Sequence, residues 1–351
     1  MFGANASPYS QPGEWQVSLS TRNLVSNDHY NGSEEQLQRQ TLQNYVTNHQ
    51  HLVDLNVSRA FSERFTLSVG IPYVNSSWAN RDPRFPLPAP RQEIEHNGRG
   101  LGDISVSGRY WLFDTKTRLD WNVAAGAGVK MPTGNHHATD FYVDTQGNNP
   151  QQRAVDMSVQ PGDGGWGIML ETAGFKRFGR VMAFASGSYL LNPKDQSATP
   201  SIRIARLPPT QEPNPAQAGT WYNSVPDQYV VRAGGSMHVW RGFSGSLAWR
   251  LEGLPRYDLL GKSHGFRRPG KAMFIEPGLA YSRGNQTFTF NVPLGYFYHR
   301  YPDPYTNNEG DATFPRHIFL AGYSWKFGGR KIVPPPLLTP PTKVGGATSR
   351  P

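Results

Sequence analysis

Short strands that alternate apolar and polar residues recur along this chain from Glu14 to Phe327. The clearest runs from Leu119 to Met131. Its odd-numbered residues, such as Trp121, Val123 and Val129, are all apolar, whereas its even-numbered residues are small, polar or charged. Successive side chains of a strand point to opposite faces, so this segment has one apolar face and one face that suits water. The pattern predicts a sheet with lipid on one side and water on the other.

Other segments repeat this alternation, although glycine, alanine or an ambiguous phase blurs some of them. We expect strands at Trp15–Arg22, Val53–Ser58, Thr66–Tyr73, Ile104–Tyr110, Trp166–Phe175, Val181–Leu191, Tyr229–Val239, Leu247–Leu254, Met273–Tyr281, Phe288–Tyr298 and Phe319–Phe327. On Phe288–Tyr298 we place Phe288, Phe290, Val292, Leu294, Tyr296 and Tyr298 on one apolar face. With Leu119 to Met131 the strands number twelve, and twelve is an even number, as bacterial outer-membrane barrels require.

The connections between these strands are short and long in strict rotation. Short turns lie at Phe61–Phe65, Phe113–Arg118, Phe175–Arg180, Trp240–Phe243 and Ser282–Gln286. Long loops lie at Asn23–Asn48, Asn75–Gly100, Pro132–Gly165, Asn192–Pro226, Pro255–Gly270 and His299–Thr313. Both termini therefore lie on the side of the short turns, which faces the periplasm in outer-membrane barrels. Aromatic residues beside the turns are typical of an interfacial girdle.

The fold expected from these patterns is all-β: a transmembrane antiparallel up-and-down barrel in the bacterial outer membrane. Residues 14–327 form the barrel, residues 1–13 an N-terminal periplasmic segment, and residues 328–351 a proline-rich tail. Such a tail favours an extended polyproline conformation and could hold a periplasmic or envelope protein partner. Residues 1–8 lack the charged and apolar regions of a secretory signal, so we expect a processed form.

Composition excludes several classes of protein. No stretch approaches the ~18 continuous apolar residues of a membrane helix, and the hydrophobic content is 37% because only one face of each strand is apolar. The chain has no cysteine, which excludes disulfides, cysteine-ligated zinc and thiol catalysis. The formal charge is +9, but lysine and arginine are scattered rather than gathered in a patch. We therefore expect contact with anionic lipid or solutes and no nucleic acid.

Charged residues on the inward faces of the strands are the candidates for the lining of a pore. They are Asp54, Arg109, Asp120, Lys130, Glu171, Arg232, Arg250, Glu252 and Glu276. Because both signs occur, they form either an open path for anions or a ladder of ion pairs that narrows the lumen. A barrel of this size leaves a narrow passage at most. On the same reasoning, the inward Asn122 should tolerate arginine in a wet lumen.

Other chemical sites are weakly supported by the sequence. His136, His137 and Asp140 resemble a metal cluster, but adjacent histidines on an extended chain point apart, so no metal or other cofactor is expected. The pair Glu93 and Glu95 is interpreted as part of a solvated loop rather than a glycosidase site. A lipid hydrolase is the enzymatic rival, since Ser236 and His238 share a face and His317 begins the last strand. We expect no enzyme.

Three glycine-rich motifs carry a resemblance to a known family. They are Gly98–Tyr110 (GRGLGDISVSGRY), Gly126–Asn135 (GAGVKMPTGN) and Gly162–Trp166 (GDGGW). They resemble successive motifs of bacterial outer-membrane transporters of the phenol meta-degradation type. The resemblance implies an outer-membrane barrel and the uptake of small organic compounds, and it names no catalytic residue. The chain departs from a common pattern of such barrels, because Phe327 is followed by the tail instead of ending the chain.

The motifs look structural in their own right. The glycines at 98, 100 and 102 lead from a loop into a strand, whereas a phosphate-binding loop leads from a strand into a helix. In the first long loop, Ser33 and Gln36 could cap a short helix from Leu37 to Tyr45 that would act as a lid or a plug. The function that we expect is a channel for facilitated diffusion of small organic solutes, aromatic or poorly polar. The alternatives are a structural barrel that docks partner proteins and the lipid hydrolase.

Overall fold

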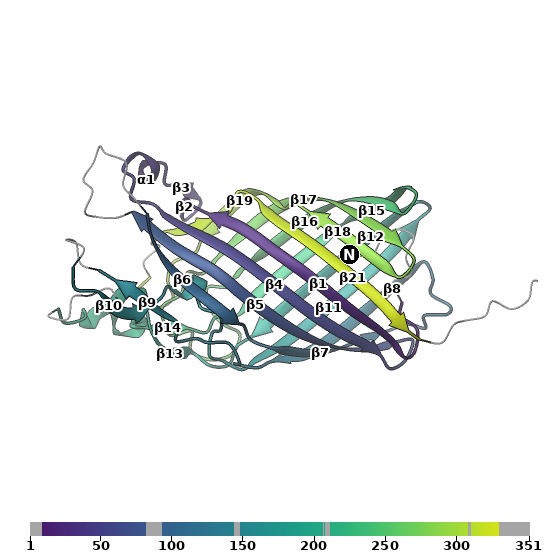
Figure 1. The fold of residues 1–351 in the computed structure, drawn as a ribbon, viewed down its shortest axis with the longest axis horizontal. Helices are drawn as coiled ribbons and strands as arrows, with labels where there is room; N and C mark the ends of the chain where they lie inside the picture. The colour runs from purple at the N-terminus through teal and green to yellow at the C-terminus, as the bar shows by residue number, and fades with distance from the viewer. Residues whose placement is uncertain are drawn as a thin grey trace, which may run out of the picture.

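The computed structural model is a closed antiparallel barrel with folded loops at one end (Figure 1), and it describes residues 9–81, 93–143, 148–205, 207, 211–307 and 310–329. The wall strands are β1 (Glu14–Ser26), β4 (Val46–Ala60), β5 (Phe65–Arg81), β6 (Glu93–Leu101), β7 (Ser105–Trp111), β8 (Trp121–Lys130), β11 (Gly167–Phe178), β12 (Val181–Leu191), β15 (Gln228–Trp240), β16 (Phe243–Leu254), β17 (Gly270–Arg283), β18 (Gln286–Asn291), β19 (Leu294–Arg300) and β21 (Ile318–Gly328). Residues 1–8 and 330–351 of the two predicted terminal segments lie outside the described residues.

The loops contain short elements of their own. These are β2 (Asp28–Asn31), β3 (Glu34–Glu35), α1 (Gln38–Thr41), β9 (Thr139–Tyr142), β10 (Gln151–Ala154), η1 (Met157–Val159), β13 (Gln196–Pro200), α2 (Ile202–Ala205), η2 (Pro215–Thr220), β14 (Tyr222–Ser224) and β20 (Ala312–Phe314). Within the described part of the chain, no helix is long and apolar enough to cross a membrane. The helix α1 is shorter than predicted. Its proposed cap is wrong, because Leu37 is the N-cap residue and the Ser33 hydroxyl bonds His299 Nδ1 at 2.7 Å.

The barrel closes because β1 pairs with β4 on one side and with β21 on the other. Fourteen strands take twelve positions around the wall, since β6 and β7 both pair with β5, and β18 and β19 both pair with β17. The predicted twelve-stranded antiparallel barrel is therefore confirmed. The hairpin of β5 and β6 is longer than predicted, and Glu93 and Glu95 lie in β6 instead of a solvated loop.

One predicted strand is interrupted, and the side assigned to one of its aromatic residues is corrected. Phe288–Tyr298 is divided into β18 and β19 around Val292 and Pro293, where proline supplies no N–H to the ladder. The phase is kept across this interruption, since Phe290, Leu294 and Tyr296 are all exposed. It changes after Tyr296, where the register between β17 and β19 shifts by one residue. Tyr296 is 55% exposed, as predicted, but Tyr298 is only 7% exposed and packs against Phe274 inside the barrel.

Elsewhere the two faces follow the alternation in the sequence. On β8, the outward Val123 is 36% exposed and Val129 is also exposed. The inward Asn122 and Ala124 of the same strand are completely buried. A soluble barrel would not expose such a large apolar surface to water, because contiguous apolar patches of this size are covered by lipid or by partner proteins. The outer surface of the strands is therefore the lipid-facing side.

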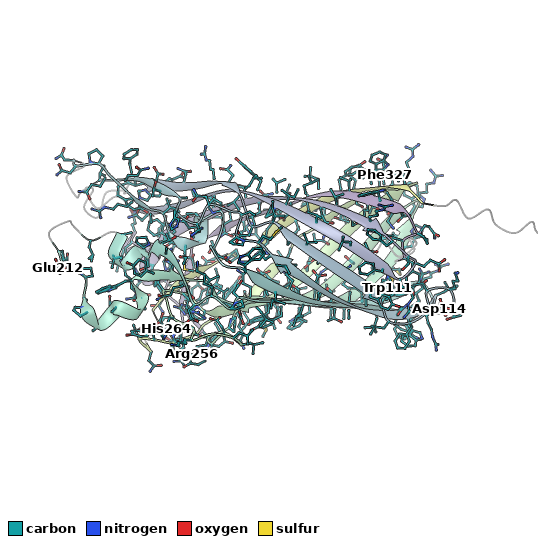
Figure 2. All side chains as sticks on the ribbon, turned by 90° about the horizontal axis from the view of Figure 1, so that it is seen from below. Trp111, Asp114, Glu212, Arg256, His264 and Phe327 are labelled. Atoms are coloured by element: carbon teal, nitrogen blue, oxygen red, sulfur yellow. The ribbon has the colours of Figure 1, made fainter. Side chains whose placement is uncertain are left out.

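Aromatic residues and arginines meet at the end of the barrel that carries the short turns. The guanidinium of Arg59 lies 5.2 Å from the ring of Trp15, and Arg64 lies 4.6 Å from the ring of Tyr110. Trp111, Asp114 and Phe327 lie at this end, opposite the long loops (Figure 2). Amphipathic rings with cations beside them suit the boundary between lipid and water. We call this end periplasmic, since the short turns of bacterial outer-membrane barrels face the periplasm.

Candidate functional site

Ion pairs inside the barrel link five charged side chains from four strands. Glu252 contacts Arg22 and Arg250, each at 2.6 Å between guanidinium nitrogen and carboxylate oxygen. Glu276 contacts Arg232 at 2.7 Å and Arg250 at 3.7 Å. We call this set the lumenal ion-pair chain. Four of its members were candidates from the sequence, and Arg22 was missed.

The lumenal ion-pair chain favours the ladder over the open path for anions. Glu276 is only 1% exposed, and a buried carboxylate is stable only if cations or hydrogen bonds compensate its charge. Three arginines face two glutamates, so the chain as a whole carries one excess positive charge. The arginines therefore cross-link the strands.

A second pair faces a lumenal cavity of about 310 Å³. Arg109 on β7 lies 3.3 Å from Glu171 on β11, and the Arg109 side chain is 45% exposed. Arg232 and Arg250 of the lumenal ion-pair chain also line the cavity, and β12 contributes Phe184 with two serines. The remaining lining residues are Thr172, Ala173, Gly174, Ala185, Gly187 and Val230. The cavity is thus lined by the Arg109–Glu171 pair and by two members of the lumenal ion-pair chain.

The remaining candidates from the sequence lie away from the cavity. Asp54 lies on β4 beside Pro72 of β5 in the strand register. Lys130 ends β8 at the long-loop end, where its Nζ contacts Asp163 and lies 3.5 Å from Asp103. Asp120 lies in the exposed turn before β8, because this strand begins one residue later than that position. These three residues do not share one site.

The three glycine-rich motifs meet at the rim of the barrel. The Asp103 carboxylate accepts hydrogen bonds from the N–H of Gly134 at 2.9 Å and of Asp163 at 3.2 Å. A Cβ atom added at Gly162 would lie 2.6 Å from the carbonyl oxygen of Gly134, so the backbones approach too closely for a side chain. The motifs therefore fasten the β8–β11 loop to the wall, which agrees with their structural interpretation.

At the periplasmic end of the lumen, a residue that the sequence did not single out packs against one side of the wall. Tyr9 packs edge-on against Trp111 of β7 and Phe175 of β11, with ring centroids 5.1 and 5.9 Å away. Its hydroxyl donates to the carbonyl of Arg118 and accepts a hydrogen bond from Asn122 Nδ2 at 3.0 Å. We call Tyr9, Trp111, Ala124, Phe175 and Met182 the Tyr9 cluster.

A signal for the Tyr9 cluster exists in the sequence. Trp111 and Phe175 occupy inward positions of their strands, and two large rings facing a wet lumen need an apolar partner. The segment that contains Tyr9 was predicted to lie in the periplasm, whereas this residue lies inside the barrel. The cavity begins one inward position further along each strand, at Arg109 of β7, Ala173 of β11 and Phe184 of β12. The Tyr9 cluster thus forms its periplasmic floor.

The long loops close the other end of the barrel. The turn η1 packs on the inner side of the wall, where Ser158 bonds Asn48 of β4 at 2.8 Å and Val159 is completely buried. Asp156, just before η1, accepts hydrogen bonds from both terminal nitrogens of Arg268 at 2.7 and 2.8 Å. Since Arg268 belongs to the β16–β17 loop, this ion pair joins two loops that leave different parts of the rim.

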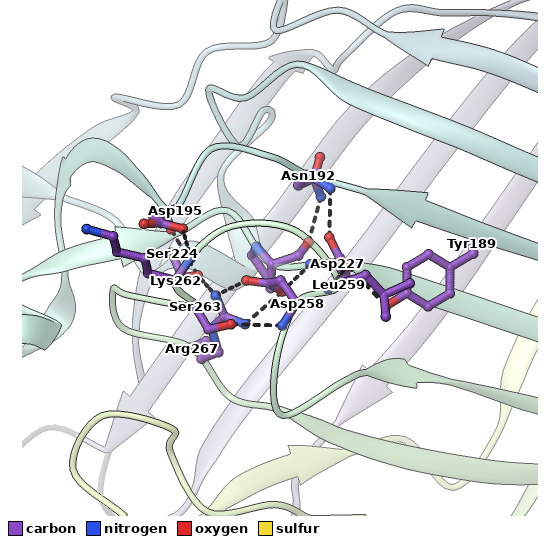
Figure 3. A network of polar contacts seen from close by, with 11 residues as sticks. Tyr189, Asn192, Asp195, Ser224, Asp227, Asp258, Leu259, Lys262, Ser263 and Arg267 are labelled. Carbon is purple, nitrogen blue, oxygen red and sulfur yellow. Dashed lines mark hydrogen bonds and ion pairs between the residues drawn. The ribbon is translucent and has the colours of Figure 1, made fainter.

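A buried polar network stiffens the same loops (Figure 3). Arg267 and Asp258 form an ion pair at 2.5 Å in which both side chains are almost completely buried. Asp258 also accepts the N–H of Asp227, and Asp227 accepts the N–H of Asn192 at 2.7 Å. Because these contacts join Asn192 and Asp227 of one loop to Asp258 and Arg267 of the other, away from water, the β12–β15 and β16–β17 loops are held together.

Removing the charge of Asp156 should loosen the β8–β11 loop, which its ion pair with Arg268 joins to the β16–β17 loop. Burial raises the pKa of Asp156, but Arg268 and the hydrogen bonds from Ser158 outweigh it and lower the pKa to about 2. Breaking a buried ion pair costs about 3–5 kcal/mol, and the lower end applies because Arg268 is 24% exposed. We expect Asp156→Asn to speed limited proteolysis of the β8–β11 loop at neutral pH, whereas the exposed Glu212→Gln should not.

The pH dependence of the wild-type loops provides an independent check. A carboxyl group whose pKa is lowered on folding stabilises the fold fully above its ordinary pKa near 4, and this stabilisation is lost as the pH falls towards 2. Proteolysis of the wild-type loop by an acid-stable protease should accelerate between pH 4 and pH 2. Asp156→Asn should lack this contribution. Equal pH profiles for the two proteins would contradict a role of the ion pair in closure.

The enzymatic and metal candidates gain no supporting geometry. Ser236 Oγ and His238 Nδ1 are buried without a hydrogen-bond partner within the described ranges, so they do not bond each other there. The rings of His136 and His137 lie 4.0 Å apart, and His137 Nδ1 contacts the hydroxyl of Thr199. No group of three or more metal-type side chains occurs among the residues described.

Several solved structures superpose on this chain at low sequence identity. An outer membrane channel from Pseudomonas putida F1 superposes with a TM-score of 0.59 at 10% sequence identity, covering 93% of this chain and 100% of that chain. The translocator domain of the autotransporter NalP from Neisseria meningitidis gives 0.45 at 11% identity, covering 92% and 91%. The toluene transporter TodX of P. putida gives 0.42 at 8% identity, also covering 92% and 91%.

No protein-family model and no curated protein matches the sequence. The identity to the P. putida F1 channel is low, so the likeness concerns the fold. Together with the apolar outer surface, the short turns and the aromatic residues beside them, it establishes the chain as a β-barrel of the bacterial outer membrane.

Proposed function

We propose that the protein is an outer-membrane channel that passes small organic solutes, aromatic or poorly polar, by facilitated diffusion. The observation that carries the proposal is the lumenal cavity, which is large enough for a small molecule and is lined by side chains from several strands. The resemblance of the glycine-rich motifs to transporters of the phenol meta-degradation type supports the same function. Facilitated diffusion through the lumen requires no cofactor.

The two closed ends determine how such a channel works. The Tyr9 cluster fills the periplasmic side of the cavity, and the loops joined by Asp156 and Arg268 cover the other side. A solute therefore occupies the cavity only after one cover moves, and it leaves after the other moves. This arrangement suits slow passage of selected molecules rather than a permanently open pore.

Uptake by intact cells tests the proposal. We expect a Gram-negative host that lacks general porins to accumulate labelled benzyl alcohol several-fold faster when it makes this protein, with sucrose uptake unchanged. Ser186→Trp should fill the cavity and return uptake to background, because Ser186 lines the cavity. The resistance of the folded barrel to unfolding in detergent would verify that this variant reaches the membrane.

The same experiment separates the channel from the docking alternative. The docking alternative is favoured by the occluded lumen, in which Tyr9 is 8% exposed. Uptake that does not rise for any small organic solute, with the barrel folded in the membrane, would reject the channel. A stable complex with an envelope protein, recovered by cross-linking in the same cells, would then support docking.

A further inference from the structure

The cavity wall contains arginines that differ in how completely they are paired. Arg250 is committed to Glu252, which it contacts through Nε at 2.8 Å and Nη2 at 2.6 Å. Arg109 makes one contact of 3.3 Å with Glu171 and is 45% exposed. A guanidinium has five N–H donors, so Arg109 has donors left for an anion inside the cavity.

Arg232 adds a second cation with unused donors. Its Nη2 lies 2.7 Å from Glu276, but neither its Nε nor its Nη2 makes an aligned hydrogen bond in the described part of the chain. The contact is therefore a charge contact, and the donors are poorly satisfied. Buried donors in this state cost free energy, which an acceptor that enters the lumen would recover.

The cavity also has an apolar side next to these cations. The ring of Phe184 lines it, and the Arg232 guanidinium lies 4.9 Å from the ring centroid. The hydroxyl-bearing Ser186 and Ser188 follow on the same face of β12. A volume of about 310 Å³ is at the small end of ligand pockets, which suits one ring rather than a long acyl chain.

We propose that this cavity binds a small aromatic monocarboxylate, with the carboxylate at Arg109 and Arg232 and the ring beside Phe184. The inference rests on the proposed channel function and specifies its solute class. A neutral arene would leave the donors of both arginines without an acceptor. An inorganic anion would gain nothing from Phe184. Only a ligand with both a ring and a carboxylate satisfies the two sides of the cavity.

Calorimetric titration of the purified full chain tests the site with three probes: benzoate, its neutral isostere benzamide, and acetate. We expect benzoate to bind roughly tenfold or more tightly than benzamide, because a charge-assisted hydrogen bond is replaced by a neutral one. Acetate should also bind more weakly than benzoate, because it has no ring to place beside Phe184. Equal affinities for benzoate and benzamide would overturn the proposal, and equal affinities for benzoate and acetate would reduce it to a site for any carboxylate and so reject the aromatic class.

Two variants move the affinity in opposite directions. Arg109→Gln should weaken benzoate binding roughly tenfold and weaken benzamide binding much less, because benzamide carries no charge to pair with the guanidinium. Glu171→Gln should strengthen benzoate binding, because it removes the carboxylate that competes for Arg109. A gain of affinity cannot arise from misfolding, so this second variant guards the test against a loss of structure. Benzoate affinity that is unchanged in both variants would overturn the assignment of Arg109.

Binding and uptake together distinguish the two proposals. Benzoate binding that responds to the variants, without uptake of any solute by cells, would retain the site and reject the channel. Uptake of benzyl alcohol without preferential benzoate binding would retain the channel and reject the site. Uptake of labelled benzoate that falls more in Arg109→Gln than uptake of benzyl alcohol does would support both.

Discussion

Val123→Arg should reduce folding of the barrel into bilayers. Val123 is 36% exposed on the outer surface of β8, so an arginine there would face lipid. The Val123 carbonyl accepts the N–H of Leu112 near the periplasmic end of the wall. An arginine on the lipid face costs about 2–4 kcal/mol at the bilayer midplane and about 0–1 kcal/mol near the interface, so we expect a cost of about 1 kcal/mol. The folded fraction in lipid vesicles, followed through urea titration, should show a lower midpoint with an unchanged slope.

Ser186→Arg is the matched control, because Ser186 lies on an inward position of β12 and lines the cavity. An arginine there would face the lumen rather than lipid, opposite Arg232 in the strand register, so the unfolding midpoint should fall less than in Val123→Arg. Equal damage from both substitutions would mean that both faces of the wall are buried in the same way. A membrane barrel with a wet lumen would then be excluded.

Asn122 is not the control that its inward position in the sequence suggested. It is completely buried, and its amide donates to Tyr9 and to the carbonyl of Phe113 while its carbonyl accepts from the N–H of Phe113. An arginine at this position would displace the Tyr9 cluster. The expectation that Asn122 tolerates arginine is therefore wrong. The physical reason is that the lumen is packed rather than wet at this depth.

The faces of the strands could be predicted because side chains alternate between the two faces and lipid selects apolar residues on the outward face. The prediction for Tyr298 was wrong, since a register shift opposite Met273 and Phe274 leaves one extra residue in β19, and the phase changes only after Tyr296. Leu294, Tyr296 and Tyr298 alternate without a break in the sequence, so this extra residue could not be predicted.

The partners inside the lumen could not be predicted. Arg22 and Glu252 are 230 residues apart in the chain, and they meet because strand tilt brings inward residues of separate strands to the same level. The alternation identifies which charges point inward, but it does not give their relative heights. The presence of both positive and negative inward residues therefore predicted either a ladder of ion pairs or an open path. Which residues pair with each other depends on the stagger of the strands.

The glycine-rich motifs illustrate a different limit. Their spacing indicated structural constraint, and the structure accounts for it through the close approach of Gly162 to Gly134 and the Asp103 carboxylate between two backbone N–H groups. Residues that carry the family resemblance thus hold a loop in place. Of the three motifs, only the first contributes a residue to the cavity, and that residue is Arg109. The residues that carry the resemblance and those that line the proposed solute site are therefore largely separate.

Tyr9→Ala should open the periplasmic side of the cavity. Burial of an aromatic or large aliphatic side chain contributes about 1.5–3 kcal/mol, and Tyr9 is buried among the rings of Trp111 and Phe175. Removal of this contribution should raise the fraction of open channels roughly tenfold to a hundredfold, since each 1.4 kcal/mol is a factor of ten. Single-channel recordings in planar bilayers would measure this as longer open times.

Tyr9→Phe separates the ring from the hydroxyl. Phenylalanine keeps the edge-on contacts with Trp111 and Phe175 but loses the hydrogen bonds to Arg118 and Asn122, each with a net contribution of about 0.5–1.5 kcal/mol. Its open fraction should lie between those of the wild type and Tyr9→Ala. If Tyr9→Ala and the wild type had the same open times, the inward rings of the wall strands would close the lumen without Tyr9, and the N-terminal segment would have no part in gating.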